Sequence, residues 1–266
     1  MILHSVKQVY FSPTGTTKTV LSAIVRGLNP ERTETIDITN PKGREQPLET
    51  SSDDLLIIGV PVYMGRVPDL IINWLNTIRA HQTPMVCVVV YGNRVYEDAL
   101  LELKNIGAKC GAIPIAGGAY IGEHSFSDDE TPTAAGRPNP DDLHHAEEFG
   151  RKIREKLQSV SAGSGISEVQ VPGEFPYRSD SKLWVVDFIS VSDDCSDCDL
   201  CAEQCPAGAI DSKNTSKINP EKCITCCACI KGCPMHARSM KPGLVQEAAV
   251  RLHTLYSEPK NPEYYL

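Results

Sequence analysis

Two copies of one cysteine pattern lie near the C-terminal end of this chain and constrain its fold more than any other feature. Each copy reads C-x2-C-x2-C-x3-C-P, the first from Cys195 to Pro206 and the second from Cys223 to Pro234. The cysteine positions of the two patterns account for eight of the eleven cysteines. Thiols at this density and regularity predict metal chemistry, because the four side chains of a site must reach a common centre.

The spacing resembles that of bacterial ferredoxins, in which the fourth cysteine of each run ligates the cluster of the other run. Three closely spaced cysteines can hold three corners of a [4Fe–4S] cubane, whereas the longer last spacing and the proline carry the chain away from the fourth corner. Structural zinc bound by four cysteines is the alternative, but zinc does not need two interlocked runs that each end in proline. The predicted ligand sets are Cys195, Cys198, Cys201 and Cys233 for one cluster, and Cys223, Cys226, Cys229 and Cys205 for the other.

The three remaining cysteines are predicted to be packing residues. Cys227 directly follows a ligand and would face away from the cluster, Cys87 lies within an apolar run, and Cys110 begins one. A free cysteine in such surroundings behaves as a small hydrophobic side chain.

Charge is divided unevenly between the two runs. Residues 187–211 contain seven acidic side chains and no Lys or Arg, whereas residues 212–241 contain six basic side chains and one acidic one, Glu221. Because reduction adds negative charge, this division predicts that the Cys195 cluster is harder to reduce than the Cys223 cluster. The alternative is that these are solvated surface charges screened by salt.

Composition limits the surroundings in which the protein works. No apolar run approaches the roughly 18 residues that a membrane span requires, and the first 15 residues lack the basic and apolar regions of a secretory signal. We therefore expect a cytoplasmic protein that does not enter a membrane, and a reducing cytoplasm favours metal binding over disulfides. The formal net charge of −8 disfavours nucleic acid and suits redox protein partners with basic surfaces.

The first 160 residues alternate between short apolar runs and amphipathic patterns. Continuous apolar runs at 55–60 and 85–90 predict strands that are buried on both faces, as in a parallel sheet covered by helices. The alternation predicts a doubly wound α/β domain with a five-stranded parallel sheet. Strands are expected at 6–11, 33–38, 54–63, 85–91 and 110–121, and helices at 16–28, 68–78, 97–107 and 140–157.

The composition changes after this alternating part and predicts the domain boundaries. The tail at 256–266 contains three tyrosines and ends in Leu266, which is typical of a docked terminus. The expected parts are an α/β domain at 1–160, a linker rich in Gly, Ser and Pro at 161–185, a small α+β cysteine-rich domain at 186–241, and a C-terminal helix and tail at 242–266.

The segment SPTGTT at 12–17 lies between the first predicted strand and the first predicted helix. Hydroxyl side chains around one glycine at a helix N-terminus form an anion site, because backbone N–H groups and the positive end of the helix face the ligand. The GxxxxGK[ST] and GxGxxG motifs do not occur here, and a plain helix cap by Ser or Thr is the alternative. A place at the carboxyl edge of a doubly wound sheet, next to the switch point, favours a ligand.

Two further loops, PVYMGRVP at 61–68 and YGNRVYEDAL at 91–100, are expected at the same edge. Aromatic or polarisable side chains offer a flat face for a ring, and glycines allow close backbone approach. A surface position for Tyr63 is the alternative. The predicted ring contacts are Tyr63, Met64, Gly65, Tyr91, Gly92, Asn93 and Tyr96.

SPTGTT resembles the T/S-x-T-G-x-T phosphate loop of flavodoxins, and nearly all 266 residues resemble the flavodoxin–ferredoxin fusion proteins of anaerobic prokaryotes. The resemblance implies a flavodoxin-like doubly wound domain followed by a bacterial-type 2[4Fe–4S] ferredoxin domain. The ring loops lack the tryptophan that often flanks the ring in ordinary flavodoxins. The implied FMN phosphate contacts are Ser12, Thr14, Gly15, Thr16 and Thr17.

These features predict an electron-transfer protein that couples FMN to two [4Fe–4S] clusters and serves low-potential redox protein partners. No catalytic triad, paired carboxylates or HExxH motif is found in the sequence. Two alternatives stay open. One is a flavin-dependent reductase of a small substrate that is supplied by its own ferredoxin domain, and the other is a redox or oxygen sensor that is not an enzyme.

A long irregular connection at 122–140 separates the fifth predicted strand from the last helix of the α/β domain. Connections of this length inside compact domains are usually functional or mobile. We expect this one to contact the flavin edge or the ferredoxin domain, with His124 and Ser125 as the residues to test; a mobile surface loop is the alternative.

Overall fold

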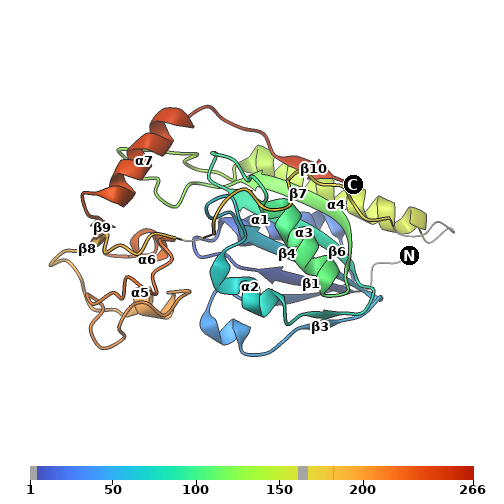
Figure 1. The fold of residues 1–266 in the computed structure, drawn as a ribbon, viewed down its shortest axis with the longest axis horizontal. Helices are drawn as coiled ribbons and strands as arrows, with labels where there is room; N and C mark the ends of the chain where they lie inside the picture. Colours follow the sequence, from blue (N-terminus) through green and yellow to red (C-terminus); the bar gives the residue numbers. More distant parts are fainter. Residues whose placement is uncertain (1–4, 161–166, 182) are drawn as a thin grey trace.

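The computed structural model describes residues 5–160, 167–181 and 183–266, so part of the predicted linker, at 161–166 and Lys182, lies outside the described residues. Its centre is a six-stranded sheet with the strand order β10-β7-β6-β4-β1-β2 (Figure 1). Five of these strands are parallel, and their order is that of flavodoxin-like doubly wound sheets. The predicted fold class is confirmed. The parallel strands are β1 (Ser5–Tyr10), β2 (Arg32–Asp37), β4 (Asp54–Pro61), β6 (Pro84–Tyr91) and β7 (Ile113–Ile121).

Two helices cover each face of the sheet. Helices α1 (Thr16–Leu28) and α4 (Pro140–Val160) pack on one face, and α2 (Asp69–Leu75) and α3 (Ala99–Lys109) pack on the other. Both faces are therefore buried, which explains the continuous apolar runs of β4 and β6.

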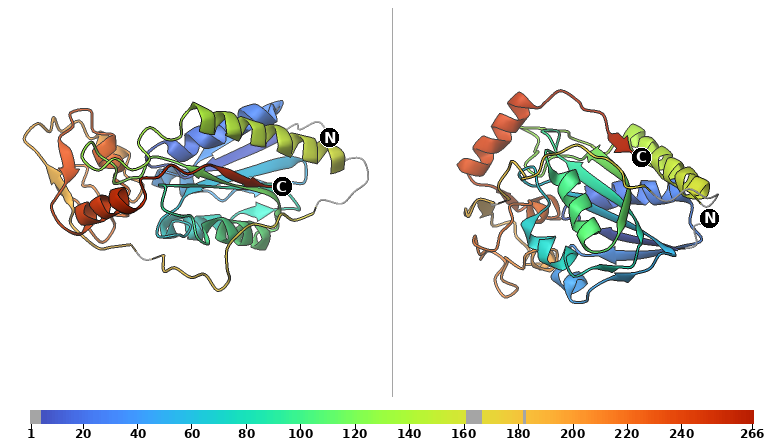
Figure 2. Two further views of the ribbon diagram at one scale, coloured as in Figure 1. Left: turned by 90° about the horizontal axis from the view of Figure 1, so that it is seen from above. Right: turned by 45° about the vertical axis from the view of Figure 1, so that its right-hand side comes forward.

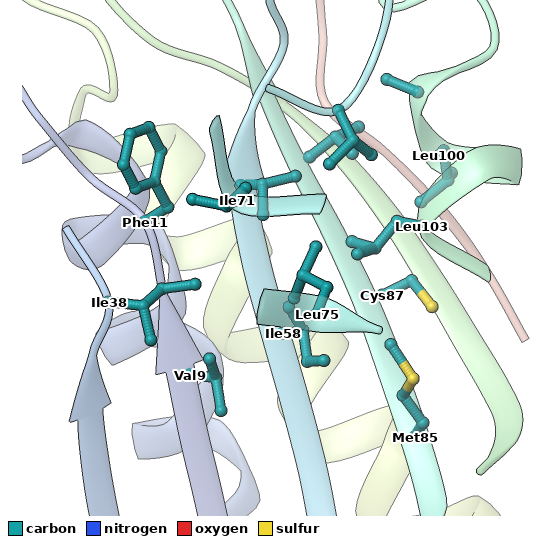
Figure 3. Close-up of a cluster of buried hydrophobic side chains, with 14 of the residues drawn as sticks. Val9, Phe11, Ile38, Ile58, Ile71, Leu75, Met85, Cys87, Leu100 and Leu103 are labelled. Carbon is teal, nitrogen blue, oxygen red and sulfur yellow. The ribbon is translucent and has the colours of Figure 1, made fainter. Parts of the chain in front are cut away.

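Successive residues of each strand contribute to opposite cores. Figure 3 shows Val9, Ile58 and Met85 of three neighbouring strands gathered with Leu75 and Leu103. Cys87 lies in the same core and is fully buried, which confirms its prediction as a packing residue.

Several short elements complete the chain. The α/β part also contains a short helix η1 (Pro41–Arg44) and a small parallel pair, β3 (Glu49–Thr50) with β5 (Arg79–Ala80). The C-terminal part contains β8 (Ile189–Val191), α5 (Leu200–Glu203), α6 (Ala228–Lys231), β9 (Arg238–Met240), α7 (Leu244–Leu255) and β10 (Glu263–Tyr265). Among the described residues, no helix combines the length and apolar character that crossing a membrane requires.

The two cysteine runs fold alike. Asp197 and Asp199 of the first run have left-handed φ angles of 49° and 60°, and Thr225 and Cys227 have 51° and 55° at the matching positions of the second. A one-turn helix follows at the same offset in each, α5 and α6. Left-handed residues turn the backbone sharply, so each run curls around its own cysteines.

The polypeptide between the α/β part and the cysteine runs is anchored along the sheet domain. The fully buried carboxylate of Asp98 accepts hydrogen bonds from the backbone N–H groups of Glu174 and Arg178, at 2.9 and 2.7 Å. Arg66 donates to the carbonyl of Ser179 at 2.7 Å. The described part of the connection therefore has a defined course.

The C-terminal tail returns to the sheet as the sequence predicts. Strand β10 pairs antiparallel with β7, and Figures 1 and 2 show it beside the sheet after a long crossing from α7. The ring of Tyr264 stacks on that of Phe149, with centroids 5.0 Å apart and planes 14° apart. The sheet therefore has one strand more than the five that were predicted.

Candidate redox site

A cavity of about 380 Å³ opens where the carboxyl ends of β1, β4, β6 and β7 meet the cysteine-rich part. This is the edge at which doubly wound folds bind ligands. Nine of the predicted cofactor-binding residues line the cavity: Ser12, Thr14, Thr16, Thr17, Tyr63, Met64, Gly65, Tyr91 and Gly92.

The SPTGTT segment forms a tight turn at the start of α1. Gly15 precedes the helix with a φ of 86°, a conformation that glycine adopts without strain, but it does not line the cavity. Thr17 is 1% exposed, and its Oγ1 is buried without a hydrogen-bond partner among the described residues. A buried hydroxyl is costly unless it has a partner, so this donor fits a phosphate oxygen of a ligand.

Two predicted contacts face the C-terminal tail rather than the cavity. Asn93 Nδ2 donates to the carbonyls of Tyr256 and Glu258, at 2.6 and 2.9 Å. The hydroxyl of Tyr96 donates to Glu263 at 2.8 Å. Because the tail occupies this side of the β6 loop, neither residue is among those that line the cavity.

The cavity has walls that the loop motifs did not indicate. Trp184 comes from the connection, Ile224 and Thr225 from the second cysteine run, and Leu244 and Arg251 from α7. The ring loops lack a tryptophan, yet Trp184 reaches the same cavity from a distant part of the sequence. Its place in the short apolar run at 183–186, just before the first cysteine run, could have drawn attention to it.

The connection at 122–140 contacts both the cavity and the cysteine-rich part, which confirms the expectation for this loop. His124 and Ser125 line the cavity, and Phe126 packs against the apolar core around Phe188. Burial, together with the positive charges of Lys231 and Arg94, lowers the pKa of His124 to about 4. His124 is therefore neutral at physiological pH, with Nδ1 accepting a 3.0 Å hydrogen bond from the backbone N–H of Phe126.

Two small cavities lie within the cysteine-rich part, and each is surrounded by four of the predicted ligands. Among the described residues, no three His, Cys, Asp or Glu side chains are arranged about one point for a single metal ion. The thiols line a space instead. Cys195, Cys198, Cys201 and Cys233 surround the first cavity, and Cys205, Cys223, Cys226 and Cys229 surround the second.

The remaining two cysteines lie in apolar packing. Cys227 is 3% exposed and belongs to the core around Phe188. Cys110 is half-buried against the core of the sheet, and its thiol donates to the carbonyl of Leu75 at 3.3 Å. The prediction that Cys110 is a packing residue is confirmed. Cys227 also packs as predicted, but it lines the second cysteine cavity, so the expectation that it faces away from this site was wrong.

The second cysteine cavity adjoins the large cavity at the sheet edge. Ile224 lines both. Burial raises the pKa of Tyr63 well above its ordinary value, and the nearby thiols Cys226, Cys227 and Cys223 raise it further. Cys226 is 8% exposed, whereas Cys198 of the first set is exposed. The first set thus lies at the surface and the second next to the large cavity.

A family comparison identifies the cysteine-rich part. Residues 188–234 match the 4Fe-4S dicluster domain. This part of the chain is a 4Fe-4S dicluster domain. It follows the flavodoxin-like sheet domain, and both predicted halves of the chain are therefore present.

Comparison with curated proteins finds a relative of the dicluster domain. The thiosulfate reductase electron transfer subunit PhsB of Salmonella typhi is 33% identical over 82 residues, which cover 29% of this chain and 42% of the relative. The chain therefore spans less than half the length of this relative.

Solved structures similar to this chain include flavodoxins. An archaeal flavodoxin has 15% identity and a TM-score of 0.40, and the match covers 58% of this chain and 99% of that one. A flavodoxin of Streptococcus pneumoniae has 14% identity and a TM-score of 0.40, with 57% and 99% covered.

Proposed function

We propose that this chain is an electron-transfer protein that holds two [4Fe–4S] clusters in its dicluster domain and FMN in the cavity at the sheet edge. FMN can exchange two electrons and each cluster one, so the three centres together can connect two-electron and one-electron partners. The observation that carries the proposal is the shared wall formed by Ile224, which lines both the large cavity and the inner cysteine cavity.

The two cysteine cavities support an assignment of the cluster ligands. Each cavity combines three cysteines of one run with the fourth cysteine of the other, as interlocked cubanes require. The backbone N–H of Ala209 donates to Sγ of Cys205 at 3.2 Å, and such hydrogen bonds stabilise thiolate ligands. We assign Cys195, Cys198, Cys201 and Cys233 to the outer cluster, and Cys223, Cys226, Cys229 and Cys205 to the inner one.

The turn at the start of α1 is suited to the phosphate of FMN. Thr17 Oγ1 supplies a buried donor that has no partner of its own among the described residues. The N-terminal end of the 13-residue helix α1 adds N–H groups and a positive dipole end. We assign phosphate binding to Ser12, Thr14, Thr16 and Thr17, with Gly15 shaping the turn, and ring contacts to Tyr63, Met64, Gly65, Tyr91 and Gly92.

The order of the three sites supports transfer between the surface and the buried cavity. Cys198 is exposed at the outer site, and Cys226 is buried at the inner site beside Ile224. A redox protein partner would dock near the outer site. The Salmonella relative carries the name of an electron transfer subunit of a reductase, and we propose redox proteins as partners here. The eleven cysteines of the chain also suit a reducing compartment, the cytoplasm.

The test is to purify the protein without oxygen, to measure iron and extracted flavin per chain, and to follow electron exchange after rapid mixing with a low-potential donor. About eight irons with one FMN are expected, and the flavin and cluster absorbance should change at rates that do not depend on protein concentration. Eight irons without flavin would leave the dicluster domain intact and contradict the coupling. Rates proportional to protein concentration would contradict transfer within one chain.

A further inference from the structure

Arg238 is a buried cation that the function proposed above has not used. It begins β9, opposite Val191 of β8, and is 4% exposed. Its Nη2 donates to the carbonyl of Thr215 at 2.6 Å. Its Nη1 is buried and has no hydrogen-bond partner among the described residues.

The guanidinium lies at the outer cysteine cavity. Arg238 and Thr215 line this cavity together with the four cysteines of the outer set. Arg238 therefore lies beside the four outer thiols.

A buried guanidinium with an unused N–H group is costly unless negative charge lies nearby. A [4Fe–4S] cluster with four thiolate ligands carries net negative charge, which one-electron reduction increases. The acidic side chains of this region, among them Asp193, Asp194 and Asp197, are exposed, so salt and water screen them. Arg238 is buried, so salt and water screen its charge less. Its single charge therefore acts more strongly on the outer cluster than the charge of any one of these exposed acidic side chains does.

In the sequence, Arg238 is one of the six basic side chains of residues 212–241, the segment that contains the second run. In the fold, β9 follows the second run and pairs with β8, which precedes the first run. This pairing places the basic side chain at the cavity that the acidic segment surrounds.

We propose that Arg238 is a charge-compensating residue that raises the reduction potential of the outer cluster, held by Cys195, Cys198, Cys201 and Cys233. This inference rests on the proposed clusters. The outer cluster accepts one electron from a one-electron donor, and its net charge falls by one unit. Arg238 keeps its proton and stabilises the added charge. The inner cluster receives a smaller effect, because Arg238 does not line its cavity.

The test is a redox titration of the whole protein with dithionite, in which electron paramagnetic resonance monitors each cluster. The iron content of every sample is measured beforehand. R238Q removes the charge, R238K keeps it, and K213Q removes an exposed charge from the same basic segment. R238Q should lower the equilibrium constant for reduction of the outer cluster at least tenfold, a fall of 59 mV for one electron. R238K and K213Q should stay close to the wild type.

Each outcome decides the matter. R238Q with full iron and unchanged midpoints would overturn the proposal. If R238Q loses iron, the result for R238K decides. Full iron and a wild-type midpoint in R238K would support a role of the charge. Loss of iron in R238K as well would mean that the guanidinium contact to Thr215 is structural, and would overturn the proposal. A wild-type protein without eight irons would instead refute the proposed clusters themselves.

Discussion

Lys231 of α6 forms an ion pair with Glu123 of the loop after β7, with Nζ 2.5 Å from Oε1. The same ammonium group donates to the carbonyl of Ser127 at 3.1 Å. The two side chains are 26% and 32% exposed. This contact joins the dicluster domain to the loop that lines the large cavity.

Replacing Lys231 by Gln should therefore weaken docking between the two halves more than overall stability. Partly exposed ion pairs contribute about 0–1 kcal/mol, so the free energy of unfolding should change little. Electron exchange between flavin and clusters should slow by about two- to fivefold. Loss of an ion pair of this energy can lower the population of the docked arrangement by a factor of this size. Rapid-mixing absorbance measurements would detect this.

The matched control is K241Q. Lys241 forms a 2.6 Å ion pair with Asp187 within the cysteine-rich part, away from the loop after β7. Equal slowing in both variants would argue against a docking role of Lys231.

Interlocked ligation predicts which cluster each fourth cysteine serves. C205A should damage the inner cluster, although Cys205 belongs to the first run, and C233A should damage the outer one. Iron analysis and electron paramagnetic resonance should find one cluster intact in each variant. If C205A instead damaged the cluster held by the other cysteines of its own run, the assignment would be wrong.

Thr17 provides a test of the phosphate turn. T17V removes the buried hydroxyl and nearly preserves the side-chain shape. A hydrogen bond to a charged group contributes about 1.5–3 kcal/mol, so FMN affinity should fall by about 10- to 100-fold. Fluorescence titration of flavin-depleted protein would measure it.

T17S should keep most of the affinity, because it keeps the hydroxyl. T19V is the control, since Thr19 is exposed and its hydroxyl donates to the carbonyl of Gly15. A T17V protein that binds FMN as the wild type does would exclude a phosphate contact there.

His124 should make stability depend on pH. Its pKa in the native protein is lowered to about 4 by burial, so between about pH 6.5 and 4 the unfolded chain binds a proton that the native protein does not. Stability from this residue is therefore complete above about pH 6.5 and falls as the pH is lowered. The loss between pH 8 and 5.5 should be about 1 kcal/mol.

Thermal unfolding midpoints of the complete protein at pH 8 and 5.5 would test this. H124Q should lose less stability over this interval than the wild type. The exposed His144 offers a control, and H144Q should behave as the wild type does. Identical pH dependence in H124Q and the wild type would contradict a neutral buried imidazole.

The tail provides a further prediction, because it follows α7, which lines the cavity. Tyr264 stacks on Phe149 and is half-buried. Y264A should destabilise the protein by about 1–2 kcal/mol, less than a fully buried aromatic would, and should speed the release of FMN by loosening α7. Thermal unfolding and stopped-flow flavin release would measure both effects.

L266A, at the 45% exposed terminal residue, should change neither quantity. If Y264A is less stable but releases FMN at the wild-type rate, the tail does not control the release of FMN.

Local patterns were sufficient to predict the parallel sheet, its helices and the gathering of the thiols within each cysteine run. Burial on both faces gives β4 and β6 continuous apolar runs, and these can be read without knowledge of any distant residue. The short cysteine spacings act in the same way, because each run curls around its own thiols through left-handed residues at matching positions, such as Asp197 and Thr225.

Contacts between distant segments were decided only by the tertiary structure. Asn93 and Tyr96 bind a tail more than 160 residues away in sequence. The same tail adds the strand β10, whose three residues are too few to predict a strand from the sequence. Trp184 and Ile224 reach the cavity from outside the sheet domain.

Sequence alone determined which residue types meet within each run, and the fold determined which charges surround them. Arg238 is the clearest case. Its neighbours in sequence are basic, yet the pairing of β9 with β8 places it at the outer cysteine cavity. Spacing and periodicity act over a few residues, whereas burial and charge depend on all segments that pack together, so only the folded chain reveals them.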